Sequence, residues 1–555
     1  MAIILKAYAN CDDVFLAWSP GEAIPNCLGF AIECRRRKNG TLGPATPLSN
    51  RVGFKADAPK AGDRRPSRDW PFQRYDWTDH AADLGDEISY RVVARVGAPG
   101  ALADGPASPW TRSMKLDAEC DGARALFNRG FVISQFVARL LKDRHLTLAE
   151  LKARAGDFED DIRRFLSGVL REELLALLAE VAGTAGVKAY AALYELGDDE
   201  LETALIACGA KVEIVLANGS VKVKGADQNE AARKRLNDAG LVVHDRMVAP
   251  GALGHNKFVV LCRGRAEQPY KLLTGSTNWT TTGLCTQVNN AIVLPDADLA
   301  GAYLAHWQRL RDAGSAKPAT LAAANPSPGG PFDLAGKGRA TAWLTPVKQA
   351  RDIERLIGLV QGARDGILFV MFNPGAEPLD TLLQRQADGF YVRGVVNQIG
   401  AAQREKIRLI RDGDGKPFFL DVIEPEGVAA KLAEWAAEVT RRQFLQDVGF
   451  AMTHSKVLVI DPFGERPVVV TGSHNFSKAA SATNDDNFVI VEGNARLAEA
   501  YAVNCMMTYQ HYRWRQYLQQ SAGKKLPAFE FLDADAAWQQ RLTSKKTVAD
   551  QAFWL

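Results

Sequence analysis

The most informative feature of this sequence is a small set of chemically active residue types that occurs twice. The two sets are His255, Lys257, Ser276 and Asn278, within GHNKFVVLC and TGSTN, and His454, Lys456, Ser473 and Asn475, within THSKVLVID and TGSHN. An imidazole can attack an electrophile or transfer a proton, an ammonium group can neutralise an anion, and hydroxyl and amide groups can donate hydrogen bonds. Such a set can hold a phosphate, attack it and protonate the oxygen that leaves, without a metal ion or cofactor.

The residues around each set predict how it is held. HNKFVVL and HSKVLVI are apolar and rich in β-branched residues, which predicts buried strands. Side chains two residues apart on a strand point the same way, so the histidine and lysine of each copy are expected to emerge together. Gly275 and Gly472 then begin predicted turns, because glycine permits a tight backbone there.

One copy alone supplies only half of what phosphoryl transfer needs. Two copies related by a pseudo-twofold axis would place a nucleophile on one side of phosphorus and an acid on the other. Lys257 and Lys456 would neutralise the non-bridging oxygens between them. We therefore expect one site shared by both copies, with no cofactor and no metal ion.

The organisation of the chain agrees with a duplication. Helical and strand patterns alternate around both copies, which predicts two α/β lobes, the first opening with an amphipathic helix at 131–145. The N-terminal residues instead show short strands between turn residues, which predicts an all-β sandwich. The predicted order is a sandwich at 1–115, lobe one at 116–321, a Pro/Gly-rich linker at 322–338, lobe two at 339–520 and a C-terminal tail at 521–555.

The N-terminal sandwich carries two aromatic residues at informative places. Trp18 on an early strand and Tyr90 on a late one resemble residues of a fibronectin type III domain, in which the tyrosine ties a corner. Residues 96–110 are predicted to close the sandwich as a linker. Adhesion, partner binding and covering of the lobes all stay open as its role.

The repeated motif resembles the signature of the phospholipase D superfamily, HxKxxxxD followed by GSxN. The second copy matches throughout, including Asp461, whereas Cys262 takes the place of the aspartate in the first. The resemblance covers roughly residues 116 to 520. It implies that one histidine attacks phosphorus to form a phosphohistidine while the other protonates the leaving oxygen and then activates water or an alcohol. Asp461 is expected on the opposite side of its strand from the lysine, where it supports the strand connection.

Downstream of the turns, the two copies differ in charge. Residues 287–290 read QVNN where the corresponding residues 484–487 read NDDN. In relatives of this superfamily, an amide or carboxylate near this point orients each histidine. The candidates are Asn289 or Gln287 for the first copy and Asp486, then Asp485, for the second.

This asymmetry suggests which histidine attacks. A carboxylate partner favours the imidazolium form of a histidine, whereas an amide leaves the ring neutral. With each orienting residue assigned to its own copy, we predict that His255 is the neutral nucleophile and His454 the general acid.

Composition places few limits on partners. The 555 residues are 47% hydrophobic and 24% charged, typical of a soluble globular protein, and the net charge of +3 neither favours nor excludes an anionic partner. No apolar run approaches the ~20 residues that cross a bilayer, and no signal peptide is evident, so we expect a cytoplasmic protein without an integral membrane segment. The 8 cysteines form no CxxC pair, which fits reduced thiols. We expect a monomer with an intramolecular pseudo-dimer.

The sequence leaves the substrate open. Two motifs in one chain resemble the phospholipase arrangement, which slightly favours a phospholipid headgroup. GSHNFSKAASATNDDN resembles the motif of compact nucleases of the superfamily, so metal-independent cleavage of DNA or RNA is the alternative. A catalytically inactive binding protein is less favoured, because both His/Lys pairs are present. His474, at the variable position of GSxN, is a further candidate for substrate contact.

Overall fold

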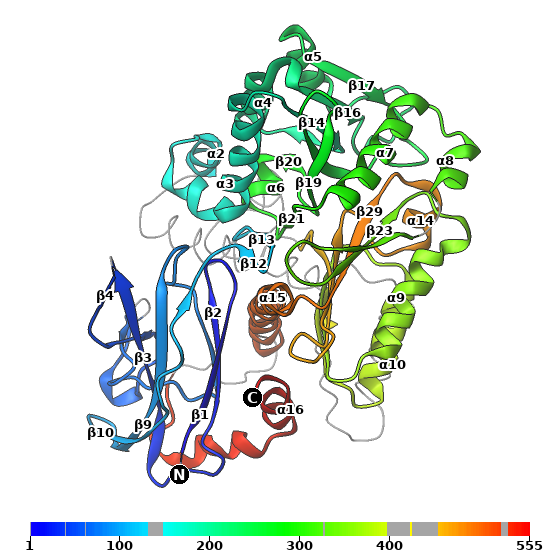
Figure 1. The fold of residues 1–555 in the computed structure, drawn as a ribbon. Coiled ribbons are helices and arrows are strands. Elements are labelled where there is room, and N and C mark those ends of the chain that lie inside the picture. Colours follow the sequence, from blue (N-terminus) through cyan, green and yellow to red (C-terminus); the bar gives the residue numbers. More distant parts are fainter. Residues whose placement is uncertain are drawn as a thin grey trace. The chain divides into compact units, whose positions relative to one another are not determined.

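The computed structural model describes residues 2–38, 40–60, 63–130, 148–325, 328–396, 422–423, 453–522 and 531–555. The chain forms two compact units, one made of Met1–Ala118 with Tyr517–Leu555 and one made of Glu119–Gln516. Figure 1 shows the elements of both. The helix predicted at 131–145 lies outside the described residues.

The N-terminal part of the first unit is built from antiparallel strands. One sheet has the order β1-β2-β8, and the other has the order β10-β9-β3-β4, with β11 paired to β9 and β5 to β3. The strands are β1 (Ile4–Ala9), β2 (Val14–Ser19), β3 (Cys27–Lys38), β4 (Thr41–Leu42), β5 (Thr46–Pro47), β8 (Asp76–Asp79), β9 (Glu87–Ala98), β10 (Ala101–Ala107) and β11 (Met114–Lys115), with a separate pair β6 (Ser49–Asn50) and β7 (Arg65–Pro66) and the 3-10 turn η1 (Lys55–Asp57). Trp18, Phe30 and Tyr90 lie in one buried cluster with residues of both sheets, so the sheets enclose a common core.

This architecture is consistent with the predicted all-β sandwich. The closer resemblance to fibronectin type III stays a prediction, and the Tyr90 hydroxyl donates to the Asp79 carboxylate at 2.8 Å rather than to a backbone group. The linker predicted at 96–110 is wrong, since residues 101–107 form β10 along β9. Gly and Pro are depleted in strands, so ALADGPA reads as a connection rather than as a strand.

The C-terminal residues complete the same unit. They form the 3-10 helix η4 (Ala536–Thr543) and α16 (Lys545–Trp554). Trp538 lies in the core of the sandwich, and its indole N–H donates to the carbonyl of Cys27 at 2.8 Å. The Gln539 amide pairs with both backbone groups of Ile24, at 2.9 Å each. The end of the chain is therefore part of the sandwich's packing rather than a free tail.

The second unit contains two eight-stranded sheets, ordered β12-β13-β21-β19-β18-β14-β16-β17 and β22-β23-β29-β28-β27-β24-β25-β26. The first consists of β12 (Glu119–Cys120), β13 (Ala123–Phe127), β14 (Val187–Leu193), β16 (Val212–Ala217), β17 (Val242–Arg246), β18 (Lys257–Arg263), β19 (Gln268–Gly275) and β21 (Asn290–Leu294). The second consists of β22 (Gly329–Asp333), β23 (Arg339–Leu344), β24 (Ile367–Met371), β25 (Val392–Val396), β26 (Val422–Ile423), β27 (Lys456–Ile460), β28 (Val468–Gly472) and β29 (Asn487–Glu492). The strand that starts at a motif lysine, β18 or β27, occupies the same place in each order.

The two sheets also agree in strand direction. β14 is parallel to β16, and β24 is parallel to β25, while each motif strand is antiparallel to both neighbours. Parallel neighbours need crossover connections, which are usually helices. The helical elements are α2 (Leu148–Gly156), α3 (Asp161–Gly183), α4 (Asp199–Cys208), η2 (Gly209–Lys211), α5 (Glu230–Asp238), α6 (Thr281–Cys285), α7 (Ala297–Ala313), α8 (Ala319–Ala324), η3 (Lys348–Ala350), α9 (Arg351–Gly362), α10 (Ala376–Ala387), α14 (Lys478–Thr483) and α15 (Ala495–Ala522).

Helix α9 illustrates why the helical pattern could be seen in the sequence. Ile353, Leu356 and Val360 recur at helical spacing and lie in one buried cluster with Ile367 and Phe369 of β24. The mixed α/β fold predicted for this region is confirmed in this way.

Two further features concern the boundaries and the membrane. The predicted linker at 322–338 contains the end of α8 and the whole of β22, which pairs with β23 at the edge of the second sheet. None of the helices that the structure describes is both long and apolar enough to cross a bilayer.

Candidate active site

The two motif strands begin two residues later than predicted. β18 starts at Lys257 and β27 at Lys456, so His255 and His454 precede their strands. Each lysine ammonium turns back instead and donates to the carbonyl oxygen of its own histidine, at 2.8 Å for Lys257 and 2.5 Å for Lys456. The lysine side chain of each copy therefore contacts the backbone of its own histidine, just before the strand begins.

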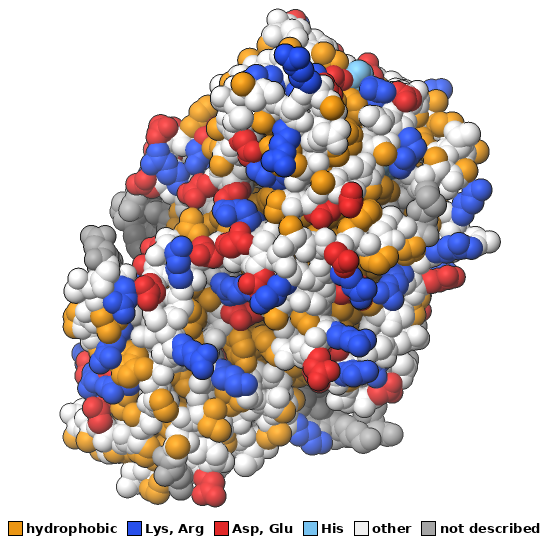
Figure 2. Space-filling model, in the orientation of Figure 1, with side chains coloured by type: hydrophobic (Ala, Val, Ile, Leu, Met, Phe, Trp, Pro, Cys, Tyr) orange, Lys and Arg blue, Asp and Glu red, His pale blue; other side chains and the backbone are white. Residues whose placement is uncertain are grey.

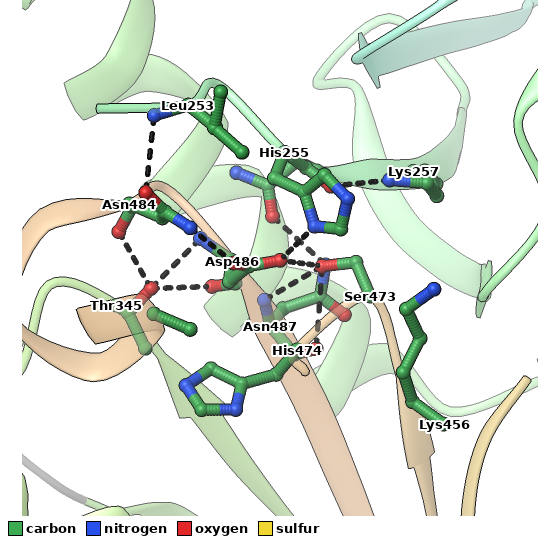
Figure 3. A network of polar contacts seen from close by, with 12 residues as sticks. Leu253, His255, Lys257, Thr345, Lys456, Ser473, His474, Asn484, Asp486 and Asn487 are labelled. Atoms are coloured by element: carbon green, nitrogen blue, oxygen red, sulfur yellow. Dashed lines mark hydrogen bonds and ion pairs between the residues drawn. The ribbon is translucent and has the colours of Figure 1, made fainter. Parts of the chain in front are cut away.

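His255 is held by a carboxylate. Its Nδ1 lies 2.7 Å from Oδ1 of Asp486. Figure 3 marks this contact between His255 and Asp486 with a dashed line. The Ser473 hydroxyl donates to the same oxygen at 2.7 Å, and the Asn484 amide donates to the other oxygen at 3.3 Å. When Nδ1 donates its proton to the carboxylate, the opposite nitrogen of the ring, Nε2, keeps a free lone pair.

His454 is held by two neutral acceptors. Its Nδ1 lies 3.0 Å from the carbonyl oxygen of Ser276 and 3.0 Å from Oδ1 of Asn289. The other end of the Asn289 amide donates to the carbonyl of Gly283 at 2.9 Å, which determines that its oxygen faces the histidine. Since both partners only accept, Nδ1 of His454 carries a proton.

The prediction that each histidine is oriented by its own copy is wrong. Asp486 of the second copy holds His255, and Asn289 of the first copy holds His454. The reason is that the segments leading into β21 and β29 lie against the opposite motif: Val288 forms a β-bridge with Thr453, and Leu253 exchanges backbone and side-chain hydrogen bonds with residues 484 and 485. The boundary between the halves runs through the site.

A second set of hydrogen bonds crosses the boundary between the two halves. Threonine and tyrosine hydroxyls of each half donate to the asparagine that starts the last strand of the other half. The contacts are Thr274 and Tyr303 to Oδ1 of Asn487, at 2.6 and 3.0 Å, and Thr471 and Tyr501 to Oδ1 of Asn290, at 2.7 and 3.1 Å. All of these residues are buried, so the floor of the site is a satisfied polar network.

Two aromatic residues that the sequence reading missed flank the histidines. Tyr194 meets the ring of His255 edge to face at 4.6 Å between centroids, and Phe372 lies 4.7 Å from the ring of His454. The ammonium groups of Lys257 and Lys456 lie over the same two rings, at 4.6 and 4.8 Å. Each aromatic directly follows a central strand, β14 or β24, and this matching position in the two halves was the available signal.

Burial and mutual repulsion weaken the positive charges of the cluster. Burial lowers the pKa of Lys257 to about 7, although Asp486 and Glu195 raise it. Burial, and then Lys257, lowers the pKa of Lys456. Burial also lowers the pKa of His255 to about 4, against the pull of Asp486. A bound anion would stabilise the protonated forms of all these groups.

The pKa of His454 is lowered by burial and by nearby charged groups of both halves. After burial, the groups that lower this pKa are Lys456 of the same half and then Lys257 and His255 of the other. The charge of one half therefore reaches the histidine of the other, which makes the two copies a single electrostatic cluster.

The two motif asparagines have hydrogen-bonding capacity left. Oδ1 of Asn278 and Oδ1 of Asn475 are buried without a partner among the described residues. The Asn278 amide donates to Oε2 of Glu195 at 2.5 Å, a contact that the sequence reading also missed. Buried polar atoms are normally satisfied, and an amide oxygen only accepts, so this remaining capacity fits a ligand group that donates a hydrogen bond.

The motif glycines allow close backbone approach. A Cβ on Gly275 would lie 2.3 Å from the carbonyl oxygen of Asn290, and one on Gly472 would lie 2.3 Å from that of Asn487. Only glycine fits at these two positions. The close approach lets the Ser276 hydroxyl accept from the N–H of Asn290 at the start of β21, and the Ser473 hydroxyl accept from the N–H of Asn487 at the start of β29.

Asp461 lies outside this cluster among the contacts that the structure describes. Its carboxylate accepts from the backbone N–H groups of Arg364, Asp365 and Gly366, at 2.7 to 3.1 Å, and so ties the end of β27 to the start of β24. Cys262, at the corresponding place, continues inside β18, which runs on to Arg263. The first half therefore keeps a longer strand where the second half uses a carboxylate cap.

Replacing Asp461 with asparagine is expected to lower the free energy of unfolding by about 1–3 kcal/mol, since three backbone donors lose a charged acceptor. Urea unfolding measures this loss, with Asp365→Asn on the exposed side of the same turn as the control. We expect kcat of the folded variant to change little. A large fall in kcat without a fall in stability would mean that Asp461 acts in the chemistry.

The remaining candidates lie away from the histidine rings. His474 is buried, accepts from the N–H of Phe476 at 2.9 Å and lies 3.3 Å from Asp352, so its ring faces α9. Asp485 pairs with Arg246 at 2.8 Å, across the boundary between the halves. Gln287 contributes its backbone carbonyl to Asn128. None of the three has a contact with His255 or His454 in the described part of the chain.

Comparisons with known proteins agree on one family. Residues 356–505 match the family model described as "Cardiolipin synthase, PLD-like domain". The chain is 31% identical over 133 residues to a phospholipase D of Rickettsia bellii, which covers 23% of this chain and 60% of that protein. It is 32% identical over 121 residues to a phospholipase D of Rickettsia felis, with 21% and 54% covered. The chain thus spans a little over half the length of these relatives.

A solved structure is similar at lower identity. The phosphatidylserine synthase of Haemophilus influenzae aligns with a TM-score of 0.38 and 10% identity, over 64% of this chain and 91% of that one.

Proposed function

Because this chain belongs to the phospholipase D superfamily, we propose that it cleaves or transfers a phosphodiester through a phosphohistidine, with the two halves acting as a pseudo-twofold pair. The observation that carries the proposal is the crossed pairing of two histidines beside two lysines in one buried cluster. Each half supplies a reacting ring and fixes the ring of the other half. Neither half alone is a complete site.

His255 is the nucleophile in this proposal, although for a different reason from the one predicted. Asp486 accepts the proton of Nδ1, so the lone pair of Nε2 can attack phosphorus. As the N–P bond forms, the ring becomes positively charged and the adjacent carboxylate stabilises that charge, as an aspartate does for the histidine of a serine protease. In this proposal the nucleophilic His255 is paired with the carboxylate of Asp486, and the general acid His454 is paired with the amide of Asn289.

His454 is the general acid and then the general base. Its Nδ1 proton is held by Ser276 O and Asn289 Oδ1, so the second proton of the imidazolium is on Nε2 and passes to the leaving oxygen as the P–O bond breaks. A neutral orienting amide leaves this proton easy to give up. In the second step, Nε2 takes a proton from water or an alcohol, whose oxygen attacks phosphorus while the bond to His255 breaks.

Lys257, Lys456, Asn278 and Asn475 bind the non-bridging oxygens in this proposal. The two ammonium groups lie close enough that Lys257, after burial, lowers the pKa of Lys456, so they can neutralise negative charge that builds up between them. The asparagines would donate to the same oxygens through their amide N–H groups. Ser276 and Ser473 support the reaction by holding Asn289 and Asp486, each at 2.7 Å.

A phospholipid headgroup is the favoured substrate, and nucleic acid is the alternative. The matched Rickettsia proteins are named phospholipase D, and the matched family model is described through cardiolipin synthase. A catalytically inactive binding protein is disfavoured because both His/Lys pairs are present and oriented.

The substrate is tested with one preparation, assayed on phosphatidylcholine vesicles and on single- and double-stranded DNA, with EDTA present throughout. We expect choline release that EDTA does not reduce, and transfer of the phosphatidyl group to added ethanol. DNA cleavage without choline release would instead identify a nuclease, whose binding should weaken steeply with salt. Activity that survives in a His255→Ala/His454→Ala double variant would refute the site.

A further inference from the structure

Glu195 places a negative charge inside a site that is otherwise arranged for an anion. The residue follows Tyr194 at the end of β14, and its side chain is half-buried. Its carboxylate accepts from the Asn278 amide at 2.5 Å, and it interacts electrostatically with both Lys257 and Lys456. A carboxylate in this place repels a phosphate anion, so its presence has to be explained.

The charge is present in only one half. Leu193 pairs with Lys257 and Met371 pairs with Lys456, so Glu195 corresponds to Asn373, two residues beyond the end of each strand. Orienting an asparagine of the motif does not require a carboxylate, because an amide oxygen can accept the same hydrogen bond. The role of Glu195 therefore lies in its negative charge rather than in its hydrogen bond with Asn278.

Burial raises the pKa of Glu195, and Lys257, hydrogen bonds from Gln228 and Asn278, and Lys456 offset only part of that rise. The negative charge of Glu195 is therefore best tested at alkaline pH, where the carboxylate form is favoured. Against the lowering by burial, Asp486 and Glu195 both raise the pKa of Lys257 and of Lys456. Asp486 is hydrogen-bonded to His255, whereas Glu195 is hydrogen-bonded to Asn278.

We propose that Glu195 determines the charge that the site accepts: it admits the monoanion of a phosphodiester and disfavours the dianion of a phosphomonoester. The inference rests on the proposed function, because hydrolysis of a diester releases a monoester. A phosphomonoester has its second pKa near 6 and is mainly dianionic at neutral pH. The second negative charge meets the Glu195 carboxylate at close range, so Glu195 speeds product release and limits product inhibition.

The test is Glu195→Gln, which removes the charge and keeps an acceptor for Asn278. Initial rates on bis(p-nitrophenyl) phosphate at pH 8 give KM and kcat, and inorganic phosphate and p-nitrophenyl phosphate are the dianionic inhibitors. We expect both inhibitors to bind on the order of tenfold more tightly to the variant, while KM for the monoanionic diester changes much less. Glu213→Gln, which removes the same charge on β16 beside His244, is the matched control.

The outcomes separate the possible roles. If Glu195 only positions Asn278, Glu195→Gln leaves the inhibition constants unchanged, and this result overturns the proposal; an equal gain in affinity for diester and monoester overturns it as well. If wild-type protein cleaves no diester, the proposed function fails on its own. Calorimetric titration of both proteins with inorganic phosphate at pH 8 then still decides the role of Glu195, since its effect on a dianion does not require turnover.

Discussion

Substitution of His255 by alanine is expected to reduce kcat by about 10⁴-fold or more and to abolish the covalent intermediate. The ring has its Nδ1 on Asp486 and its second nitrogen available, so its loss removes the only group in this assignment that can bond to phosphorus. Intact-protein mass spectrometry after an alkaline quench should show a phosphoryl adduct on the wild type. Peptide mapping should place it on His255.

His454→Ala provides the complementary result. With bis(p-nitrophenyl) phosphate, the leaving group is stable as an anion and needs little help from an acid, so the first step should survive. The second step lacks its base, and the adduct on His255 should therefore accumulate. His244→Ala, on β17 away from the site, is the control and should behave like wild type. An adduct on His454 in the wild type, in His255→Ala or in His244→Ala would reverse the assignment.

Much of the α/β region could be predicted because its signals are local. The buried face of α9 repeats at helical spacing, and the apolar runs of β14, β18 and β27 are continuous. Strand β10 could not be predicted, because ALADGPA contains residues that are rare in strands, and its pairing with β9 is a tertiary contact. The place of Trp538 in the sandwich core was hidden for the same reason, since its contact with Cys27 spans most of the chain.

The members of the site could be predicted better than their partners. His255, Lys257, His454 and Lys456 are brought together as the repeated motif indicated. Glu195 and the two flanking aromatics were missed because their residue types differ between the halves, and their only signal is the matching position after β14 and β24. They are recognised only when the ends of β14 and β24 are compared in space.

The crossed pairing could not be read from the sequence for a geometric reason. Aligning two copies shows which residues correspond, but it does not show which copy a side chain faces. Here the segments before β21 and β29 lie at the boundary between the halves, and each reaches the other's histidine. His255 stays the proposed nucleophile, but for a reason opposite to the predicted one. Its partner is a carboxylate rather than an amide, and a carboxylate stabilises a nucleophilic ring as the ring becomes charged.

This reasoning makes Asp486 the residue with the next largest expected effect. Asp486→Asn should lower kcat by about 10³- to 10⁴-fold, as loss of the carboxylate does for the histidine of a serine protease. The amide neither stabilises the charged ring nor holds a single tautomer, although Ser473 and Asn484 keep the side chain in place. Single-turnover kinetics should show slow formation of the adduct, with its breakdown affected less.

Two variants distinguish this explanation from a loss of charge or of fold. Asp485→Asn removes the neighbouring carboxylate, which pairs with Arg246 and has no described contact with His255; we expect a lower melting temperature but nearly normal kcat for the folded protein. Asn289→Asp places a carboxylate on His454 instead, which should raise the pKa of that ring and slow release of its proton to the leaving group. If Asp485→Asn were as slow as Asp486→Asn in forming the adduct, or if Asn289→Asp left proton transfer unchanged, the partners of the rings would not set their roles. The carboxylate would then act through the general field of the site, and the difference between the two histidines would have to arise from the substrate.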